Sequence, residues 1–262
     1  MAPTTRCYIS LRGEWTFTLT LVYSLIISVP GILLNVFVLM VFCLHKKACT
    51  VPEIYMSNLA AADLLLVSCL PFWAMYVGDS CDWDFCKLVP YFFLMNTFCS
   101  VYFLVLVSLD RYMALVHPMT LERLRRPKYA KLSCVVVWGV GLLLIVPLLI
   151  SHDGLIYMII VSFIIPISII FYCTFRIILA LNNRVMHGLN TQKMEKKATT
   201  LVLAVLFTFL ICWVPYYLTI IIQLLNRAQI LGGCSLRQFL VKYYWIFWNF
   251  AFIDSVLNPI LY

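Results

Sequence analysis

The chain has 262 residues, of which 64% are apolar and 11% charged, whereas a typical soluble domain is about 45–50% apolar and 25% charged. This composition excludes an ordinary soluble enzyme. The net charge of +8 would suit a nucleic-acid-binding protein, but in so apolar a chain basic residues more often record the orientation of membrane segments. The positions of the basic residues decide between these two interpretations.

Apolar stretches separated by polar segments predict seven transmembrane helices, since a helix needs about 20 mostly apolar residues to cross a bilayer. The predicted fold class is all-α, a seven-transmembrane helix bundle over residues 17–262 preceded by an N-terminal segment, residues 1–16. Polar residues inside the helices should face the bundle interior. The predicted helices cover residues 17–44, 54–78, 87–116, 130–150, 155–181, 198–225 and 238–262.

The basic residues predict the orientation of this bundle. Of the 19 lysines and arginines, most lie at the helix ends that include residues 45–50, 117–129 and 182–197. The positive-inside rule places these ends in the cytoplasm and the N-terminus outside the cell. Membrane topology therefore explains the charge, and no nucleic-acid partner is expected. Residues 1–16 lack an apolar core followed by a cleavage site, so we expect the first helix to be an uncleaved signal anchor.

The 11 cysteines separate by position. Those within predicted helices and those facing the reducing cytoplasm are expected to be free thiols. Four others face the oxidising side, where they allow three disulfide connectivities that spacing alone does not distinguish. These four are Cys7, Cys81, Cys86 and Cys234.

Each predicted helix carries one landmark, and the set resembles the rhodopsin-like G-protein-coupled receptors. By itself, Asp110-Arg111-Tyr112 could be a helix-end charge pair at the membrane interface. Its combination with the other landmarks, in this order, is far more specific. They are Asn35, the Asn58 to Asp63 run, Trp138, Pro166, Cys212-Trp213-Val214-Pro215 and Asn258-Pro259-Ile260-Leu261-Tyr262.

Longer stretches are similar to the bradykinin receptors, with the angiotensin receptors next. They include Leu70-Pro71-Phe72-Trp73-Ala74, Val107 to Tyr112 and Ile230-Leu231-Gly232-Gly233-Cys234. The resemblance implies a multi-pass plasma-membrane receptor, not an enzyme. It would bind a bradykinin-like peptide and signal to a heterotrimeric G protein by movement of helix six. Membrane lipid, and arrestin where a C-terminal tail is present, are the other expected partners.

Activation and G-protein coupling are predicted at one end of the bundle. A guanidinium at the membrane boundary is costly unless it is paired, and Glu195 is the expected partner of Arg111 in the inactive state. Alternatively, Glu195 is a solvated residue of the Met194-Glu195-Lys196-Lys197 run. The resemblance assigns this function to Asp110, Arg111, Tyr112, Glu195, Pro215, Asn258, Pro259 and Tyr262.

Asp63 is the strongest interior signal, because a carboxylate inside a membrane helix must be neutral, paired or bound to a cation. The resemblance implies a sodium pocket, and no other cofactor is expected. Asp254 departs from the usual pattern and adds a second carboxylate, which favours a shared proton or stronger cation binding. Hydrogen-bonded polar packing without an ion is the alternative. The pocket residues would be Asp63, Asn96, Ser100, Asn249, Asp254 and Asn258; Asn96 would also restrain activation.

A ligand cavity is predicted at the opposite end, with Trp213 at its base and Pro215 kinking helix six as a lever. Some of its aromatic residues could instead belong to an interfacial belt or to the core. Gln223 and Val241, with Lys242 beside it, stand where bradykinin receptors have acidic residues, so the ligand should differ in charge or be an altered kinin. The expected lining is Trp73, Tyr76, Trp83, Lys87, Tyr91, Met95, Trp213, Tyr216, Tyr217, Thr219, Gln223, Trp245 and Trp248.

The resemblance also pairs Cys7 with Cys234 and leaves Cys86 without its usual partner. The second extracellular connection is reduced to about residues 151–154 and contains no cysteine. Cys81 is therefore the candidate that could replace the usual partner of Cys86. The short loop and the end of the chain at Tyr262 raise an alternative: a non-signalling or decoy variant lacking that loop and the tail. A related receptor for a different peptide is a further alternative.

Overall fold

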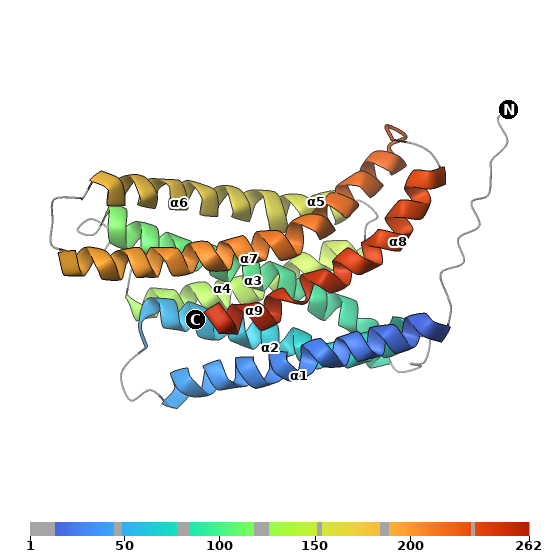
Figure 1. Ribbon diagram of the computed structural model, residues 1–262, viewed down its shortest axis with the longest axis horizontal. Coiled ribbons are helices and arrows are strands. Elements are labelled where there is room, and N and C mark those ends of the chain that lie inside the picture. Colours follow the sequence, from blue (N-terminus) through green and yellow to red (C-terminus); the bar gives the residue numbers. More distant parts are fainter. Residues whose placement is uncertain are drawn as a thin grey trace.

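The computed structural model describes the chain apart from residues 1–13, 45–48, 78–83, 118–125, 151–153, 184–188, 232–233 and 262. Every regular element in the described part is helical. The helices run side by side along the long axis, with α1 and α6 at opposite edges of the view (Figure 1). In chain order they are α1 (Glu14–Leu44), α2 (Val51–Val77), α3 (Asp84–Val116), α4 (Pro127–Ile150), α5 (Gly154–Ile159), the π-helical turn η2 (Ile160–Ile164), α6 (Ile165–Asn183), α7 (Leu189–Arg227), α8 (Cys234–Ala251) and α9 (Asp254–Leu261).

These elements confirm the predicted seven-helix bundle. Within the described residues, 6 segments are long and apolar enough to cross a membrane, and Ile246–Leu261 forms a shorter apolar stretch. The fifth membrane helix consists of α5, η2 and α6, and the seventh consists of α8 and α9. The central helix is α3, which contacts α2, α4, α6 and α7. In the apolar membrane-spanning stretch of α3, 67% is buried inside the protein, whereas only 22% of that stretch of α4 is buried. Helix α4 therefore lies at the periphery.

Two helices differ from the prediction by more than the one to three residues seen at the ends of the others. The sixth helix begins at Leu189 rather than at residue 198, because apolar content marks where a helix enters the membrane and not where its backbone hydrogen bonds begin. The seventh is interrupted at residues 252–253, where the amides of Phe252 and Ile253 bond to the carbonyls three residues earlier, at 3.1 and 3.2 Å. This tighter turn separates α8 from α9.

Helix α1 is joined to the seventh helix on both sides of this interruption. Pro259 has no N–H, so it cannot donate to the Ser255 carbonyl four residues earlier. The Asn35 side-chain amide donates to that carbonyl instead, at 2.9 Å. On the other side, the Tyr23 hydroxyl donates to the Asn249 carbonyl at 2.6 Å. Side chains of α1 therefore satisfy backbone groups at both places.

Two of the landmark residues meet between α2 and α4. The Trp138 indole N–H donates to the Asn58 side-chain oxygen at 3.0 Å, and the Asn58 amide donates to the Ile54 carbonyl at 2.8 Å. This contact fixes the outer helix α4 against α2. The hydrogen bond accounts for a tryptophan and an asparagine at these positions. It gives the two residues a structural role rather than a role in ligand binding.

Close packing of α1 on α2 yields a first prediction. A Cβ atom added at Gly31 would lie 2.8 Å from Val67 Cγ1, whereas one added at Gly139 would meet nothing within 4 Å. Gly31→Ala should therefore lower stability by about 1–3 kcal/mol through overpacking. Gly139→Ala, the matched control, should be neutral or stabilising because alanine favours helix. Thermal denaturation followed with a thiol-reactive dye would measure both; equal melting temperatures would contradict the packing.

Candidate functional site: a buried polar cluster beneath an aromatic cluster

A buried carboxylate joins three helices at the centre of the bundle. Asp63 on α2 is 1% exposed. It accepts hydrogen bonds from two residues of α3 and two of α9, and these helices are thereby held together. The donors are Asn96 Nδ2 at 3.2 Å, Ser100 Oγ at 3.4 Å, Ser255 Oγ at 2.9 Å and Asn258 Nδ2 at 3.0 Å.

Only some of the residues predicted to form the pocket donate hydrogen bonds to Asp63. Asn96, Ser100 and Asn258 do so, whereas Ser255, which sequence reasoning missed, makes the shortest of the four contacts. The spacing along the helix could have identified Ser255, since it precedes Asn258 by three residues and shares a helix face with it. For Asn249, the contact that the structure defines is at its backbone carbonyl, which accepts from Tyr23.

Asp254 lies beside Asp63 and also contacts α7. Its carboxylate interacts electrostatically with Asp63, but its hydrogen-bond partner is Trp213, whose indole N–H donates to Oδ2 at 3.1 Å. Both residues are buried, at 2% and 1% exposure. The second carboxylate therefore extends the polar cluster to α7 and connects it to the predicted lever.

The donor set of this cluster suits a small hard cation. The side-chain oxygens Asp254 Oδ1 and Asn258 Oδ1 are buried and, among the described residues, have no hydrogen-bond donor. Two carboxylates and an amide oxygen are the ligand types that alkali and alkaline-earth cations prefer. No cluster of three or more histidine, cysteine or acidic residues that could hold a metal ion occurs in the described ranges.

An aromatic cluster lies directly beside the polar one. Phe93 on α3 is its centre, with its ring centroid 4.0 Å from Trp248, 5.7 Å from Trp213 and 5.4 Å from Phe252. Tyr216 packs edge-on against Trp248 at 5.3 Å. Sequence reasoning missed Phe93, although it precedes Asn96 by three residues and so shares its inward face.

The predicted cavity residues fall into three groups. Trp213, Tyr216, Tyr217, Thr219 and Trp248 are buried, so they form the packed floor. Trp73, Tyr91, Met95 and Gln223 are half-buried and lie nearer the end of the bundle. Outside the described side chains are Tyr76, Trp83, Lys87, Val241, Lys242 and Trp245.

The π-helical turn η2 receives two tyrosine hydroxyls. A π-turn shifts backbone hydrogen bonds to the i+5 register, and such turns often mark functional sites. Tyr102 donates to the Val161 carbonyl at 3.0 Å and Tyr217 to the Ser162 carbonyl at 3.4 Å. The turn therefore links the fifth membrane helix to α3 and α7.

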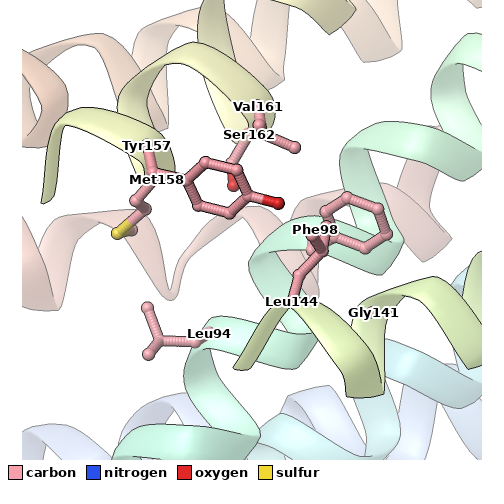
Figure 2. A pocket seen from close by; sticks show the side chains of 8 residues that line it. All are labelled: Leu94, Phe98, Gly141, Leu144, Tyr157, Met158, Val161 and Ser162. Atoms are coloured by element: carbon pink, nitrogen blue, oxygen red, sulfur yellow. The ribbon is translucent and has the colours of Figure 1, made fainter. Parts of the chain in front are cut away.

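A small pocket lies between α3, α4, α5 and η2. Figure 2 shows the Tyr157 ring extending across it toward Phe98. Its volume of about 20 Å³ has room for roughly one water molecule, so it does not accommodate a peptide. It is lined by Leu94, Phe98, Gly141, Leu144, Tyr157, Met158, Val161 and Ser162.

The tyrosine contacts at η2 give a second prediction. Tyr102→Phe should cost about 1 kcal/mol, because it removes one intramolecular hydrogen bond and keeps the ring that stacks on Phe98. Tyr129→Phe is the control, since Tyr129 is 49% exposed. Thermal denaturation of the purified variants compares the two. Equal losses would show that the Val161 contact contributes nothing.

At the opposite end of α3, the Asp110-Arg111-Tyr112 motif is in place. Asp110 is fully buried, while Arg111 and Tyr112 are half-buried. The Tyr112 hydroxyl lies 3.1 Å from Nε2 of His117. Pro215 and Pro259 lie inside α7 and α9 as expected. The side chains of Glu195 and Tyr262 lie outside the described residues, so the Arg111–Glu195 pair stays a prediction.

The cysteines that were predicted to be free thiols are confirmed. Five of them are buried within helices, and Cys43 and Cys49 lie at or near the Arg111 end. They are Cys43, Cys49, Cys69, Cys99, Cys134, Cys173 and Cys212. The proposed disulfide residues Cys7, Cys81, Cys86 and Cys234 lie outside the described side chains.

A bundle of seven membrane helices, with a buried carboxylate that joins three of them and an Asp-Arg-Tyr motif at the end of the third, defines the class of seven-transmembrane receptors. The profile of the "7 transmembrane receptor (rhodopsin family)" matches residues 34–154 and 151–262. The chain belongs to this family. The predicted resemblance and the multi-pass plasma-membrane location are thereby confirmed, and the chain is a receptor rather than an enzyme.

Curated relatives place the chain more narrowly. It is 38% identical to the human B2 bradykinin receptor over 95% of this chain and 71% of that receptor. The pig B2 bradykinin receptor is 37% identical over 98% of this chain and 78% of the relative. The human B1 bradykinin receptor is 33% identical over 88% and 74%. The similarity to bradykinin receptors thus extends over most of the chain.

Proposed function

We propose that the chain is a receptor for a bradykinin-like peptide that signals to a heterotrimeric G protein by movement of α7. The observation that carries the proposal is the 38% identity to the human B2 bradykinin receptor, in an alignment that covers 95% of the chain. The geometry supports it, because Trp213 contacts both the aromatic cluster and Asp254. A ligand that displaces Trp248 or Phe93 would change the packing of Trp213 and so shift α7.

A sodium ion in the polar cluster belongs to this proposal. Asp63, Asp254 Oδ1 and Asn258 Oδ1 would hold it, and its single charge would compensate for one of the two buried carboxylates. With the ion bound, α2, α7 and α9 would be held together at one place, which favours the inactive arrangement of the helices. We expect sodium chloride, compared with choline chloride, to raise the melting temperature of the purified receptor. An equal effect of both salts would leave polar packing without an ion.

The resting state would also depend on the Arg111–Glu195 pair. Glu195→Ala should raise basal signalling several-fold, because Arg111 would then be free to contact the G protein. Lys197→Ala, in the same polar run, is the matched control and should leave basal signalling unchanged. Basal inositol phosphate accumulation at equal surface expression measures both. An unchanged level for Glu195→Ala would mean that Glu195 is simply solvated.

The second candidate function is a non-signalling or decoy receptor. The observation that favours it is the short connection at residues 151–154, where the two matched segments of the family profile meet. Such a variant would bind peptide and not activate a G protein. We retain for both candidates a Cys7–Cys234 bridge, with Cys81 as the partner for Cys86, and contact with membrane lipid; arrestin would bind where a tail follows.

One experiment separates these candidates. Cells expressing the chain would be challenged with bradykinin and with an angiotensin peptide, while calcium release and binding of labelled peptide are recorded in parallel. Calcium release with bradykinin supports the receptor proposal, and binding without release supports the decoy. Binding of the angiotensin peptide alone would assign the chain to a different ligand. Surface labelling in the same cells controls for expression.

A further inference from the structure

Three exposed basic residues lie at the beginning of α4. Arg126, Lys128 and Lys131 are all exposed, and the first turn of α4 contains no acidic residue. Within the described part of the chain, none of the three forms an ion pair. We call them the α4 basic cluster. Their exposure makes these charges accessible to a partner from outside the protein.

The position of this cluster on its helix strengthens its positive potential. A helix N-terminus carries a partial positive charge, so acidic side chains are stabilising there and cations are not. The α4 basic cluster places three cations at or next to this end, which costs stability in the isolated protein. A bound anion would offset both the side-chain charges and the helix dipole.

An open apolar face continues from the cluster along the same side of α4. Lys128, Leu132, Val135, Gly139 and Leu142 follow one another at helical spacings of three or four residues. Leu132, Val135 and Leu142 are 58%, 67% and 56% exposed. A Cβ atom at Gly139 would meet nothing within 4 Å, so the face is open there. Because α4 is a membrane span at the periphery, this face lies against lipid.

We propose that the α4 basic cluster and this face bind an anionic glycerophospholipid whose headgroup carries more than one negative charge. The headgroup lies at Arg126, Lys128 and Lys131, and the acyl chains lie along Val135 and Gly139. Charge complementarity selects an anion, and continuity with the membrane-embedded face selects a lipid over a soluble polyanion. The positive-inside rule places this end in the cytoplasmic leaflet, where anionic lipids are concentrated.

The proposal is independent of the peptide ligand, so a test that uses no peptide separates the two. The full chain would be purified in detergent and titrated with phosphatidylinositol 4,5-bisphosphate, with phosphatidylserine at matched total charge and with phosphatidylcholine. Native mass spectrometry counts retained lipids. We expect each receptor to retain one molecule of the phosphoinositide and to bind it more tightly than either of the other two lipids.

Variants then locate the site. Arg126→Gln/Lys128→Gln/Lys131→Gln should weaken phosphoinositide binding roughly 100-fold, because each cation near an anionic lipid surface contributes roughly five-fold. The matched control is Arg176→Gln, which removes an exposed cation from α6 and should leave binding unchanged. Unaltered melting temperatures would show that the variants are folded.

Three results would overturn the proposal. The first is undiminished binding to the triple variant. The second is a combined result: phosphatidylserine at matched charge binds as tightly as the phosphoinositide, and Arg176→Gln weakens binding as much as the triple variant does. Binding would then reflect general surface electrostatics. The third is equally tight binding of soluble inositol trisphosphate or displacement by heparin, which would assign the cluster to a soluble polyanion.

Discussion

Asp63→Ala is expected to lower the stability of the receptor by about 3 kcal/mol or more, because it leaves four buried donors without their acceptor. These donors are Asn96, Ser100, Ser255 and Asn258. For a chain of this size the loss corresponds to a fall in melting temperature of roughly 6–12 °C. The difference between sodium chloride and choline chloride should disappear in the same measurement.

The comparison with Asp63→Asn separates charge from hydrogen bonding. Asparagine keeps one acceptor oxygen but places an NH₂ group where Oδ2 accepts from Asn258. We therefore expect a smaller loss of stability and the same loss of sodium dependence. A sodium effect that persists in Asp63→Asn would show that the ion, if bound, does not need the Asp63 charge, and would contradict the proposed pocket.

Trp213→Ala is the second change with a large expected effect. The indole is 1% exposed and packs against Phe93, Phe209 and Tyr216, so its removal should cost about 3–5 kcal/mol. Trp213→Phe keeps most of this packing and removes the hydrogen bond to Asp254, worth about 1.5–3 kcal/mol for an ionised acceptor. We expect Trp213→Phe to raise basal signalling, since α7 is then no longer joined to Asp254.

Trp138→Phe provides the control for this second prediction. Its indole donates to Asn58 at 3.0 Å, a distance close to the 3.1 Å of the Trp213–Asp254 bond, but it lies between α2 and α4. Trp138→Phe should lose about 0.5–1.5 kcal/mol, less than Trp213→Phe because its acceptor is a neutral amide, and basal signalling should change only in Trp213→Phe. A parallel change in signalling would mean that loss of stability alone, and not release of α7, causes the effect.

The two clusters form one continuous structure across the bundle. Trp248, Phe93 and Trp213 are in ring contact, and Trp213 is hydrogen-bonded to Asp254. Asp254 is next to Ser255, which donates to Asp63. A change in aromatic packing thus has a short path to the residues that hold α2, α3 and α9 together. Coupling between distant sites requires an element of this kind to have two alternative arrangements, and the Trp213 variants above test for the second one.

Much of this arrangement was visible in the sequence. Residue type and hydropathy are local properties, so they predicted the membrane helices, the inward-facing polar residues and the free cysteines. The resemblance to rhodopsin-like receptors, rather than these local properties, assigned Asp63, Asn96, Ser100 and Asn258 to one pocket, and the structure brings them together. The bounds of α7 were less visible, because its polar first turns continue a helix beyond the apolar segment.

Only the tertiary structure decided how the helices face one another. The role of Ser255, the central position of Phe93 and the pairing of Asp254 with Trp213 depend on how each helix is rotated about its axis, which packing against neighbours sets. The same holds for η2 and for the interruption between α8 and α9, whose backbone groups find donors on other helices. Hydropathy marks which residues are buried, whereas contacts between distant parts of the chain determine their partners.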